Sequence, residues 1–499
     1  MATGMVAVLT LGARAESPQT RALSLEDCIQ IAIQHNLDVQ IVRTGPQIAQ
    51  FTLSGTYGDY DPLFRLSGRH DYNLEPGGFD TQGRLYVGQE SETDTFGSGI
   101  SGLLPWGLNY DLGARMADRY GTFPQGTNSI RNPFEATSGQ VGLLELRQPL
   151  LKNFWIDSTR LQIFLNKQNV KISELDVRLQ IINTVSEVEA AYFDLIHAQE
   201  SVKVQQQAME LAERLVAENR RRVEVGALAP LDSRQAESQA ASSRADLLQA
   251  QSTRGTLERV LKNLLSDNYN DWANVIVQPT DALLAIPQQF NLQDSWRVGL
   301  AMRPDLLQAK LNLEKQGYVV RYQKNQLYPQ LDLVGGWGYN AGGVSKEFSD
   351  AFGQISSADN PFYGVGATLT FPLGNTGARN SYKSAKVSKE QIELQLKQLQ
   401  QSTLIKIENA MAVAETSFQR VTATREARLY AEAALEAEQT KLEKGKSTTF
   451  VVLQLQKDLT AARSSEIRAL ADYNIALARL AQNEGSTLDR RQISMQVSK

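Results

Sequence analysis

The sequence is poor in the residues that build disulfides, metal centres and catalytic sites. Cys28 is the single cysteine among 499 residues, which excludes a disulfide framework, a cysteine-based zinc site and an iron–sulfur cluster. The three histidines, His35, His70 and His197, are far apart and lack the HExxH spacing, which leaves little material for metal binding or general-base chemistry. We therefore expect no enzyme, no catalytic residue, no metal site and no cofactor.

The chain also lacks a strong charge of either sign and any long apolar run. Its 51 basic and 55 acidic residues leave a net charge of −4, so we expect no nucleic-acid partner. No apolar run approaches the roughly 18 residues that a membrane-spanning helix needs. A short apolar stretch at residues 5–12 precedes Ala13-Arg14-Ala15. Residues 1–15 are therefore predicted to be a signal peptide of an exported protein, with a disordered N-terminus as the alternative.

Proline is scarce in a way that favours very long helices. Of the fifteen prolines, none lies in residues 160–224 or 379–444, and proline normally ends or kinks a helix. Apolar residues recur every three or four positions at Leu175, Leu179, Ile182, Val185, Val188, Tyr192 and Leu195. This spacing predicts one buried stripe and coiled-coil packing, with the polar faces in water. A helix over 153–224 would run for roughly 100 Å.

Strand patterns occur in other places. Apolar and small or polar residues alternate over 331–339, over 364–371, and for eleven residues from Trp106 to Met116. Such segments are long enough to cross an outer membrane as tilted strands, but a soluble antiparallel sheet with one wet face shows the same alternation. The long amphipathic helices, with nothing else in the chain to cover them, favour the membrane alternative.

An internal repeat organises the chain. Residues 24–73 match residues 291–340 without a gap at an offset of 267, and the offset falls to 223 and then to 219 further along. The first drop means that the first half carries 44 additional residues somewhere in 74–137. Each half reads as a helix, a strand region, a long helix, a glycine turn and a second helix.

Several short motifs recur in order in the two halves. Asn36-Leu37-Asp38-Val39 and Arg303-Pro304-Asp305-Leu306 lie near helix starts, Tyr328-Pro329-Gln330-Leu331 enters a strand, and 147–151 leaves one. The segments 222–232 and 441–450 each centre on a glycine between two long helices. In this order and duplication the chain resembles the TolC-like outer membrane efflux proteins (outer membrane factors) over nearly its whole length.

The resemblance implies an α+β, mainly α, fold with two structural repeats per chain. Three chains would form a homotrimer with one β-barrel in outer membrane lipid, continued by a long α-helical coiled-coil barrel in the periplasm. In this family each chain gives four strands, twelve in all. The candidates here are 63–73, 138–148, 330–341 and 362–371, and the 44 additional residues with the Trp106 segment would form an extracellular hairpin or replace one of these four.

The expected organisation follows the repeat. We expect a first repeat over 16–290, with strands within 62–148, a long helix 153–225, a tip turn 226–230, a second helix 231–265 and a linker 266–290. The second repeat is expected over 291–486, with a helix 292–327, strands within 330–371, a long helix 377–444, a tip turn 445–449, a second helix 450–483 and a C-terminal tail 487–499.

The function that the resemblance implies is passive conduction. An inner-membrane pump and a periplasmic adaptor (membrane fusion protein) would dock on the tunnel, in a tripartite efflux or type I secretion system. Drug, metal and protein export all fit the sequence. The alternative is a soluble or periplasmic coiled-coil scaffold without transport activity, which would have no use for eleven-residue amphipathic strands.

The two glycine turns are the candidate site. Glycine tolerates the φ > 0 of a tight turn and exposes backbone to a partner. The predicted adaptor-docking residues are Gly226, Ala227, Leu228, Gly445, Lys446 and Ser447. Resemblance also makes Asp232 a candidate gate link between hairpins, with Lys444 or Lys446 as its partner. The acidic ring that the family carries six and nine residues after the second tip glycine is missing, because Val451 and Gln454 stand there.

Overall fold

The computed structural model describes residues 19–79, 81–124, 131–226, 229–343 and 348–493. The chain is mainly helical and divides into two units. Unit 1 comprises Met1–Pro46, Ile172–Lys310 and Gln395–Lys499, and unit 2 comprises Gln47–Lys171 and Leu311–Leu394. The predicted signal peptide, 1–15, lies outside the described residues.

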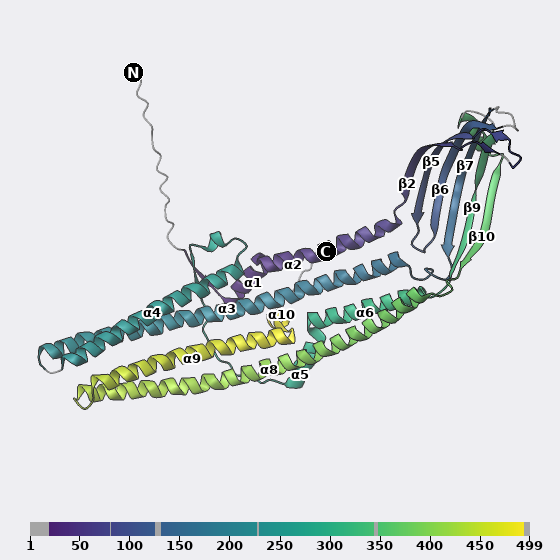
Figure 1. Ribbon diagram of the computed structural model, residues 1–499. Helices are drawn as coiled ribbons and strands as arrows, with labels where there is room; N and C mark the ends of the chain where they lie inside the picture. Colours follow the sequence, from purple (N-terminus) through teal and green to yellow (C-terminus); the bar gives the residue numbers. More distant parts are fainter. Residues whose placement is uncertain (1–18, 80, 125–130, 227–228, 344–347, 494–499) are drawn as a thin grey trace, which may run out of the picture. The chain divides into compact units, whose positions relative to one another are not determined.

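Unit 2 contains an antiparallel sheet of six strands in the order β10-β9-β7-β6-β5-β2 (Figure 1). Their bounds are β2 Leu63–Leu74, β5 Glu90–Leu103, β6 Asn109–Pro124, β7 Arg131–Pro149, β9 Gln330–Gly343 and β10 Pro361–Thr370. The short pair β3 (Gly78–Phe79) and β4 (Leu85–Tyr86) lies between β2 and β5 in sequence, and α7 (Phe348–Ser357) lies between β9 and β10. Successive side chains of a strand point to opposite faces of the sheet. The alternation of apolar residues with small or polar ones therefore gives each strand one apolar and one polar face.

The 44 additional residues do not form a hairpin outside the sheet, and they do not replace one of the four expected strands. All four expected segments are strands, and β5 and β6 are inserted between β2 and β7 in the same sheet. β5 pairs with β2 from Glu90 to Ser101 and with β6 from Glu90 to Leu103. The prediction of four strands was therefore wrong, because serine, threonine and glycine in β5 gave no apolar alternation to detect.

The predicted strand from Trp106 to Met116 begins later than its alternation indicates. Trp106 lies in the turn between β5 and β6. Gly107 closes this turn: its φ is +91°, and its N–H donates a hydrogen bond to the Leu104 carbonyl at 2.7 Å. Leu108 accepts a hydrogen bond from the Leu104 N–H at 2.8 Å. The first residues of the alternating segment therefore belong to the tight turn, and β6 starts at Asn109.

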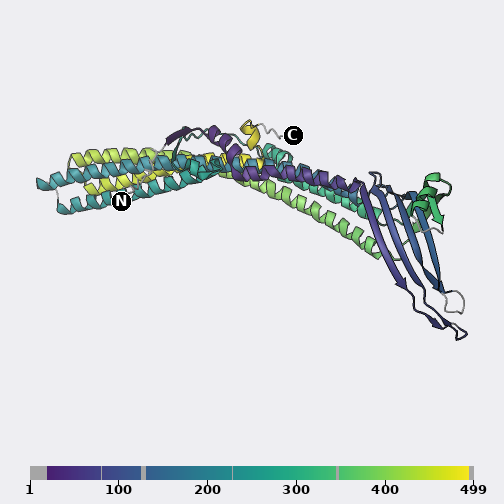
Figure 2. The ribbon, with the colours of Figure 1, turned by 90° about the horizontal axis from the view of Figure 1, so that it is seen from above.

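Two helical hairpins dominate unit 1. The first joins α3 (Ser158–Glu224) to α4 (Pro230–Leu265), and the second joins α8 (Thr376–Glu443) to α9 (Thr449–Glu484). In two perpendicular views α3 lies beside α4 and α8 beside α9 (Figures 1 and 2). Within the described residues, no helix combines the length and the apolar character that a membrane span requires.

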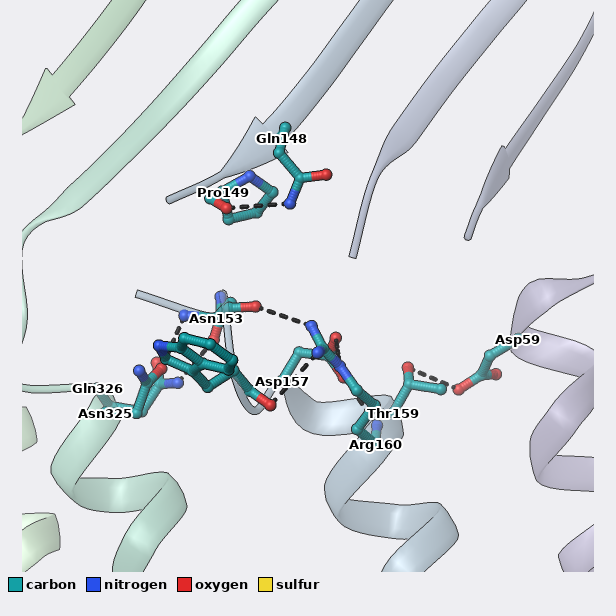
Figure 3. Close-up of polar contacts among 10 residues, drawn as sticks. Asp59, Gln148, Pro149, Asn153, Asp157, Thr159, Arg160, Asn325 and Gln326 are labelled. Carbon is teal, nitrogen blue, oxygen red and sulfur yellow. Dashed lines mark hydrogen bonds and ion pairs between the residues drawn. The ribbon is translucent and has the colours of Figure 1, made fainter. Parts of the chain in front are cut away.

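The first long helix begins at Ser158 and not at residue 153, because residues 153–157 make a capped turn. Asn153 has a φ of +64°, and the Asp157 carboxylate accepts from the Arg160 N–H at 2.7 Å as a helix cap. The Arg160 guanidinium binds the same carboxylate at 2.8 Å and the Asn153 carbonyl at 3.1 Å (Figure 3). Asn325 accepts from the Asn153 N–H at 2.7 Å, so this turn is fixed from both sides.

The predicted helix 292–327 is two helices, α5 (Leu292–Met302) and α6 (Pro304–Asn325). Arg303 between them is extended, with φ −63° and ψ 124°, because a residue before proline avoids the helical region. Asn36 separates α1 (Leu25–His35) from α2 (Leu37–Thr56) with a similar extended backbone, although Leu37 and not a proline follows it.

The largest hydrophobic core of unit 1 lies where α1, α3 and α4 meet. Its fully buried members include Ile29, Val185, Tyr192, Leu195, Leu261 and Leu265. The expected linker 266–290 contributes Trp272, Val275 and Val277 to this core, and its strand β8 (Val275–Pro279) pairs in parallel with β1 (Gln19–Leu23). The Tyr192 hydroxyl donates to Asp281 at 2.7 Å. The expected C-terminal tail, 487–499, contains the short helix α10 (Thr487–Arg490), and residues 494–499 lie outside the described residues.

Candidate partner-docking tips

Each hairpin of unit 1 ends at a glycine in the left-handed conformation. Gly226 has a φ of +74° and Gly445 a φ of +72°. Among the residues that the structure describes, no atom beyond the two adjacent residues and the glycine's own helix lies within 4 Å of where a Cβ would stand on either glycine, so both backbones are open. Glycine is needed here because a side chain strains this region of backbone space.

The second tip has the hydrogen bonds of a Schellman motif. The Lys446 N–H donates to the Lys441 carbonyl at 2.8 Å, and the Gly445 N–H donates to the Leu442 carbonyl at 3.0 Å. At the first tip, the Gly226 N–H donates to the Val223 carbonyl at 3.0 Å. Both turns therefore satisfy carbonyls at the end of a long helix while leaving the glycine uncovered.

Glu438 organises the side chains at the second tip. Its carboxylate accepts from the Lys441 ammonium at 2.7 Å and from the Ser447 hydroxyl at 2.5 Å. The hydrogen bond from Lys441, followed by that from Ser447, lowers the pKa of Glu438 below its usual value. The sequence analysis missed Glu438, although an acid three residues before a lysine in a helix is a recognisable pair.

At the first tip the contacts join α3 to α4. Asn219 is buried, and its amide donates to the Asp232 carbonyl at 3.5 Å. Arg220 on α3 lies 2.9 Å from Glu237 on α4, and Arg234 lies 3.1 Å from the same carboxylate. Arg220, followed by the smaller contribution of Arg234, lowers the pKa of Glu237. The contacts of Asn219 and Arg220 hold the hairpin closed beside its tip, and no local motif in the sequence indicates them, whereas Arg234 and Glu237 form a local pair within α4.

The predicted site residues fall in different places. Gly226, Gly445, Lys446 and Ser447 lie at the tips, whereas Ala227 and Leu228 lie outside the described residues. Asp232 stands in the first turn of α4 and is half-buried. Lys444 and Lys446 are exposed at the second tip, and within the described chain neither forms an ion pair with the Asp232 carboxylate.

A groove of 210 Å³ separates the two hairpins behind the tips. Residues of all four long helices line it, among them Leu211, Gln239, Asp246, Leu435, Gln456 and Arg463. Arg463 donates to Gln207 at 3.4 Å across the groove and binds Glu432 of its own hairpin at 2.7 Å. Arg468 on α9 reaches Asp194 on α3 at 3.0 Å. The hairpins are thus tied by polar contacts that border water-accessible space.

The sheet of unit 2 has two unlike faces. One bears exposed apolar side chains that the strand register places together, namely Phe64, Leu66, Phe96, Ile100, Leu112, Trp337, Val365 and Leu369. The other borders a cavity of 700 Å³ lined by Arg65, Ser67, Asp111, Arg115, Gln140 and Asn340. Such a sheet suits an apolar medium on one side and water on the other. Across the described residues, no group of three or more His, Cys, Asp or Glu side chains could hold a metal ion.

Comparisons with known proteins agree with this architecture. The family model described as "Outer membrane efflux protein" matches residues 123–266 and 298–486. The outer membrane efflux protein BepC of Brucella suis is 24% identical over 369 residues, which are 72% of this chain and 75% of BepC.

Solved structures of similar fold are outer membrane and membrane proteins. A membrane protein from Pseudomonas aeruginosa superposes with a TM-score of 0.68 at 18% identity, covering 95% of this chain and 92% of its own. The Campylobacter jejuni CmeC outer membrane channel gives 0.67 at 16% identity, covering 93% and 86%. The chain therefore belongs to the outer membrane efflux protein family and is an outer membrane protein that extends into the periplasm.

Proposed function

We propose that the chain is the outer membrane duct of a tripartite efflux or type I secretion system. Substrates delivered by an inner-membrane pump and a periplasmic adaptor would leave through it, and no bond would be made or broken. The observation that carries this proposal is the sheet with one apolar, exposed face and one polar face bordering a 700 Å³ cavity. A scaffold without transport activity would need neither face.

The working form is proposed to be a homotrimer. In the single chain, apolar side chains along α8 remain exposed, namely Val387, Leu394, Ile405, Val413, Leu429 and Tyr430. Both edge strands of the sheet also lack a partner on one side within the described sheet, and open sheet edges are not viable in lipid. Neighbouring copies would cover both features, with the sheets closing one β-barrel and the hairpins one helical tunnel.

The two-repeat organisation is also part of the proposal. It is supported by the matched breaks at Asn36 and Arg303 and by the matched tips at Gly226 and Gly445. The first repeat would be 16–290 and the second 291–486. Each would then supply one hairpin to the tunnel.

Adaptor docking is proposed at the tip residues Gly226, Ala227, Leu228, Gly445, Lys446 and Ser447. If the glycines only end helices, Gly445→Asn should retain function, because asparagine tolerates the left-handed conformation. If a partner contacts the bare backbone, the variant should fold and form the oligomer but lose copurification with the adaptor and export. The control is Gly317→Asn in α6, which should keep both. At Gly317, outside its own helix backbone, the described part of the chain places no atom within 4 Å of the Cβ position.

The gate proposal concerns Asp232 with Lys444 or Lys446 of a neighbouring hairpin. An exposed pair of this kind contributes about 0.2 to 1 kcal/mol. Asp232→Ala should raise the single-channel conductance in a planar bilayer, whereas Asp246→Ala, an exposed acid on the same helix, should leave it unchanged. Equal conductance of Asp232→Ala and the wild type would contradict the gate proposal.

The channel itself is tested by fractionation, native mass spectrometry and conductance of the full chain. We expect outer membrane material, a species near three times the chain mass of 55.3 kDa less any cleaved signal peptide, and ion conductance in bilayers. A soluble monomer or dimer would instead support the coiled-coil scaffold.

A further inference from the structure

The inserted hairpin β5–β6 is an integral part of the sheet. β5 is hydrogen-bonded along its length, with twelve register pairs to β2 and fourteen to β6. β6 continues the ladder to β7, with one register shift between Asp111 and Leu112. A loop excursion would leave β2 beside β7, whereas here two further strands separate them.

The hairpin also continues both faces of the sheet without interruption. The register aligns Phe64 of β2 with Ile100 of β5 and Leu112 of β6 on the apolar face. On the opposite face it aligns Ser67 with Gly97 and Arg115, and Arg115 with Gln140 of β7. Because the two added strands extend both the apolar and the polar face, they are suited to form part of the wall of a barrel.

The two edges of the sheet are suited to each other. Because every pairing in the sheet is antiparallel, a sheet of six strands has edge strands of opposite direction. β2 of one copy can therefore pair antiparallel with β10 of the next. β2 has twelve residues and β10 has ten, and nearly all of them are exposed. β10 carries no charged residue to block such pairing.

From these observations we propose that three copies of this chain close a barrel of eighteen strands, six from each, in place of the twelve that four strands per chain would give. The proposal rests on the trimeric channel proposed above. Since barrel diameter grows roughly in proportion to strand number, the wall would be about one and a half times as wide as a twelve-stranded one. The polar cavity face, with Arg65 and Arg115, would line its interior.

Electron cryo-microscopy of the full-length protein in lipid nanodiscs tests the strand number directly. Eighteen strands around a threefold axis are expected. A threefold particle with twelve strands would overturn this inference and leave the channel function intact. A particle without threefold symmetry would overturn the trimer, and the inference with it.

Paired cysteines give an independent test of the hairpin's place in the wall. The Ser67 hydroxyl oxygen lies 2.8 Å from where a Cβ on Gly97 would stand, which is close to the geometry of a disulfide. The double variant Ser67→Cys, Gly97→Cys should cross-link within one chain, as read by mass spectrometry of the purified oligomer. The matched pair Ser67→Cys, Gln140→Cys spans two intervening strands and should not. The reverse result would place β2 beside β7 and overturn the inference.

Discussion

Asn36 and Arg303 hold nearly the same backbone conformation, φ −64° and ψ 126° against φ −63° and ψ 124°. Each separates two helices, and the side chain of each reaches the end of the helix that returns from a tip. The Asn36 amide donates to the Leu264 carbonyl of α4 at 3.1 Å, and the Arg303 guanidinium donates to the Asn483 carbonyl of α9 at 2.8 Å. Different residues thus perform one structural task in the two halves.

Arg303→Ala should destabilise the second of these junctions. Arg303 also binds Asp305 through two nitrogens, at 2.6 and 3.0 Å, and its side chain is only 11% exposed. Losing these bonds leaves the Asn483 carbonyl and the Asp305 carboxylate short of a donor, for a loss of about 2 kcal/mol in the free energy of unfolding. Guanidinium denaturation followed by circular dichroism measures this loss.

Arg297→Ala is the matched control for Arg303→Ala. Arg297 lies on the adjoining helix α5 and pairs with Asp294 at 3.1 Å, but its side chain is 78% exposed. Its removal should change stability by less than about 0.5 kcal/mol. Equal effects of the two substitutions would contradict the role given to Arg303.

The same junction should give the protein an acid-dependent loss of stability. Burial alone would raise the pKa of Asp305, but the hydrogen bonds and charge of Arg303 outweigh it and lower the pKa below its usual value. A carboxyl with a lowered folded-state pKa stabilises the fold above its unfolded pKa of about 3.9, and this stabilisation is lost as pH falls through the folded value.

Asp305→Asn measures the acid effect. The variant should be less stable than the wild type at pH 7, and the difference should shrink as the pH falls below about 4. Denaturation midpoints of both proteins between pH 7 and pH 3 give the comparison. A difference that stays constant over this range would show that the charge of Asp305 is not involved.

Charge on the apolar face of the sheet should impair membrane insertion. Val365 is 84% exposed on that face, and Thr368 lies on the opposite face of the same strand, where it aligns with Asp332. Val365→Arg places a cation against lipid at a cost of about 2 to 4 kcal/mol near the bilayer centre. We expect a lower yield of Val365→Arg in the outer membrane fraction, with Thr368→Arg close to the wild type. Similar yields would contradict the assignment of the faces.

Cys28 should resist thiol reagents in the folded protein. It is fully buried, and burial, assisted by the charges of Asp27 and Asp281, raises its pKa to about 12. The reactive thiolate is therefore scarce at pH 8 and has no access to reagent. Labelling with a maleimide should reach one thiol per chain only after denaturation. Rapid labelling of the native protein would show that the core around α1 opens.

The long helices and the paired tips could be predicted because their signals are local. Proline-free segments, the recurrence of apolar residues and a glycine at each turn placed the end of α3 and the start of α8 within one residue of their observed bounds. The start of α3 was displaced, since it depends on Asp157 capping the helix and on Asn325 binding Asn153. The second of these contacts joins residues far apart in sequence.

The sheet was only partly predictable. Strands with an apolar alternation were found, whereas β5 has Gly97, Gly99 and Ser101 facing the polar side and shows little pattern. Its strand character comes from being paired on both sides, which is tertiary context. The contacts of Glu438 with Ser447 and of Glu237 with Arg220 depend in the same way on the hairpin being formed.

The order of pairing in the sheet also bears on how the chain is assembled. β2, β5, β6 and β7 pair as neighbours in their order along the chain, with only the short pair β3 and β4 between β2 and β5. β7 also pairs with β9, and the whole first helical hairpin lies between β7 and β9 in sequence. Closing a connection of that length costs conformational entropy, and this cost must be met before the β7–β9 hydrogen bonds can stabilise the sheet. The seam between Pro149 and Asp332, where that ladder begins, is therefore the step at which we expect folding to be slowest and mispairing between copies most frequent.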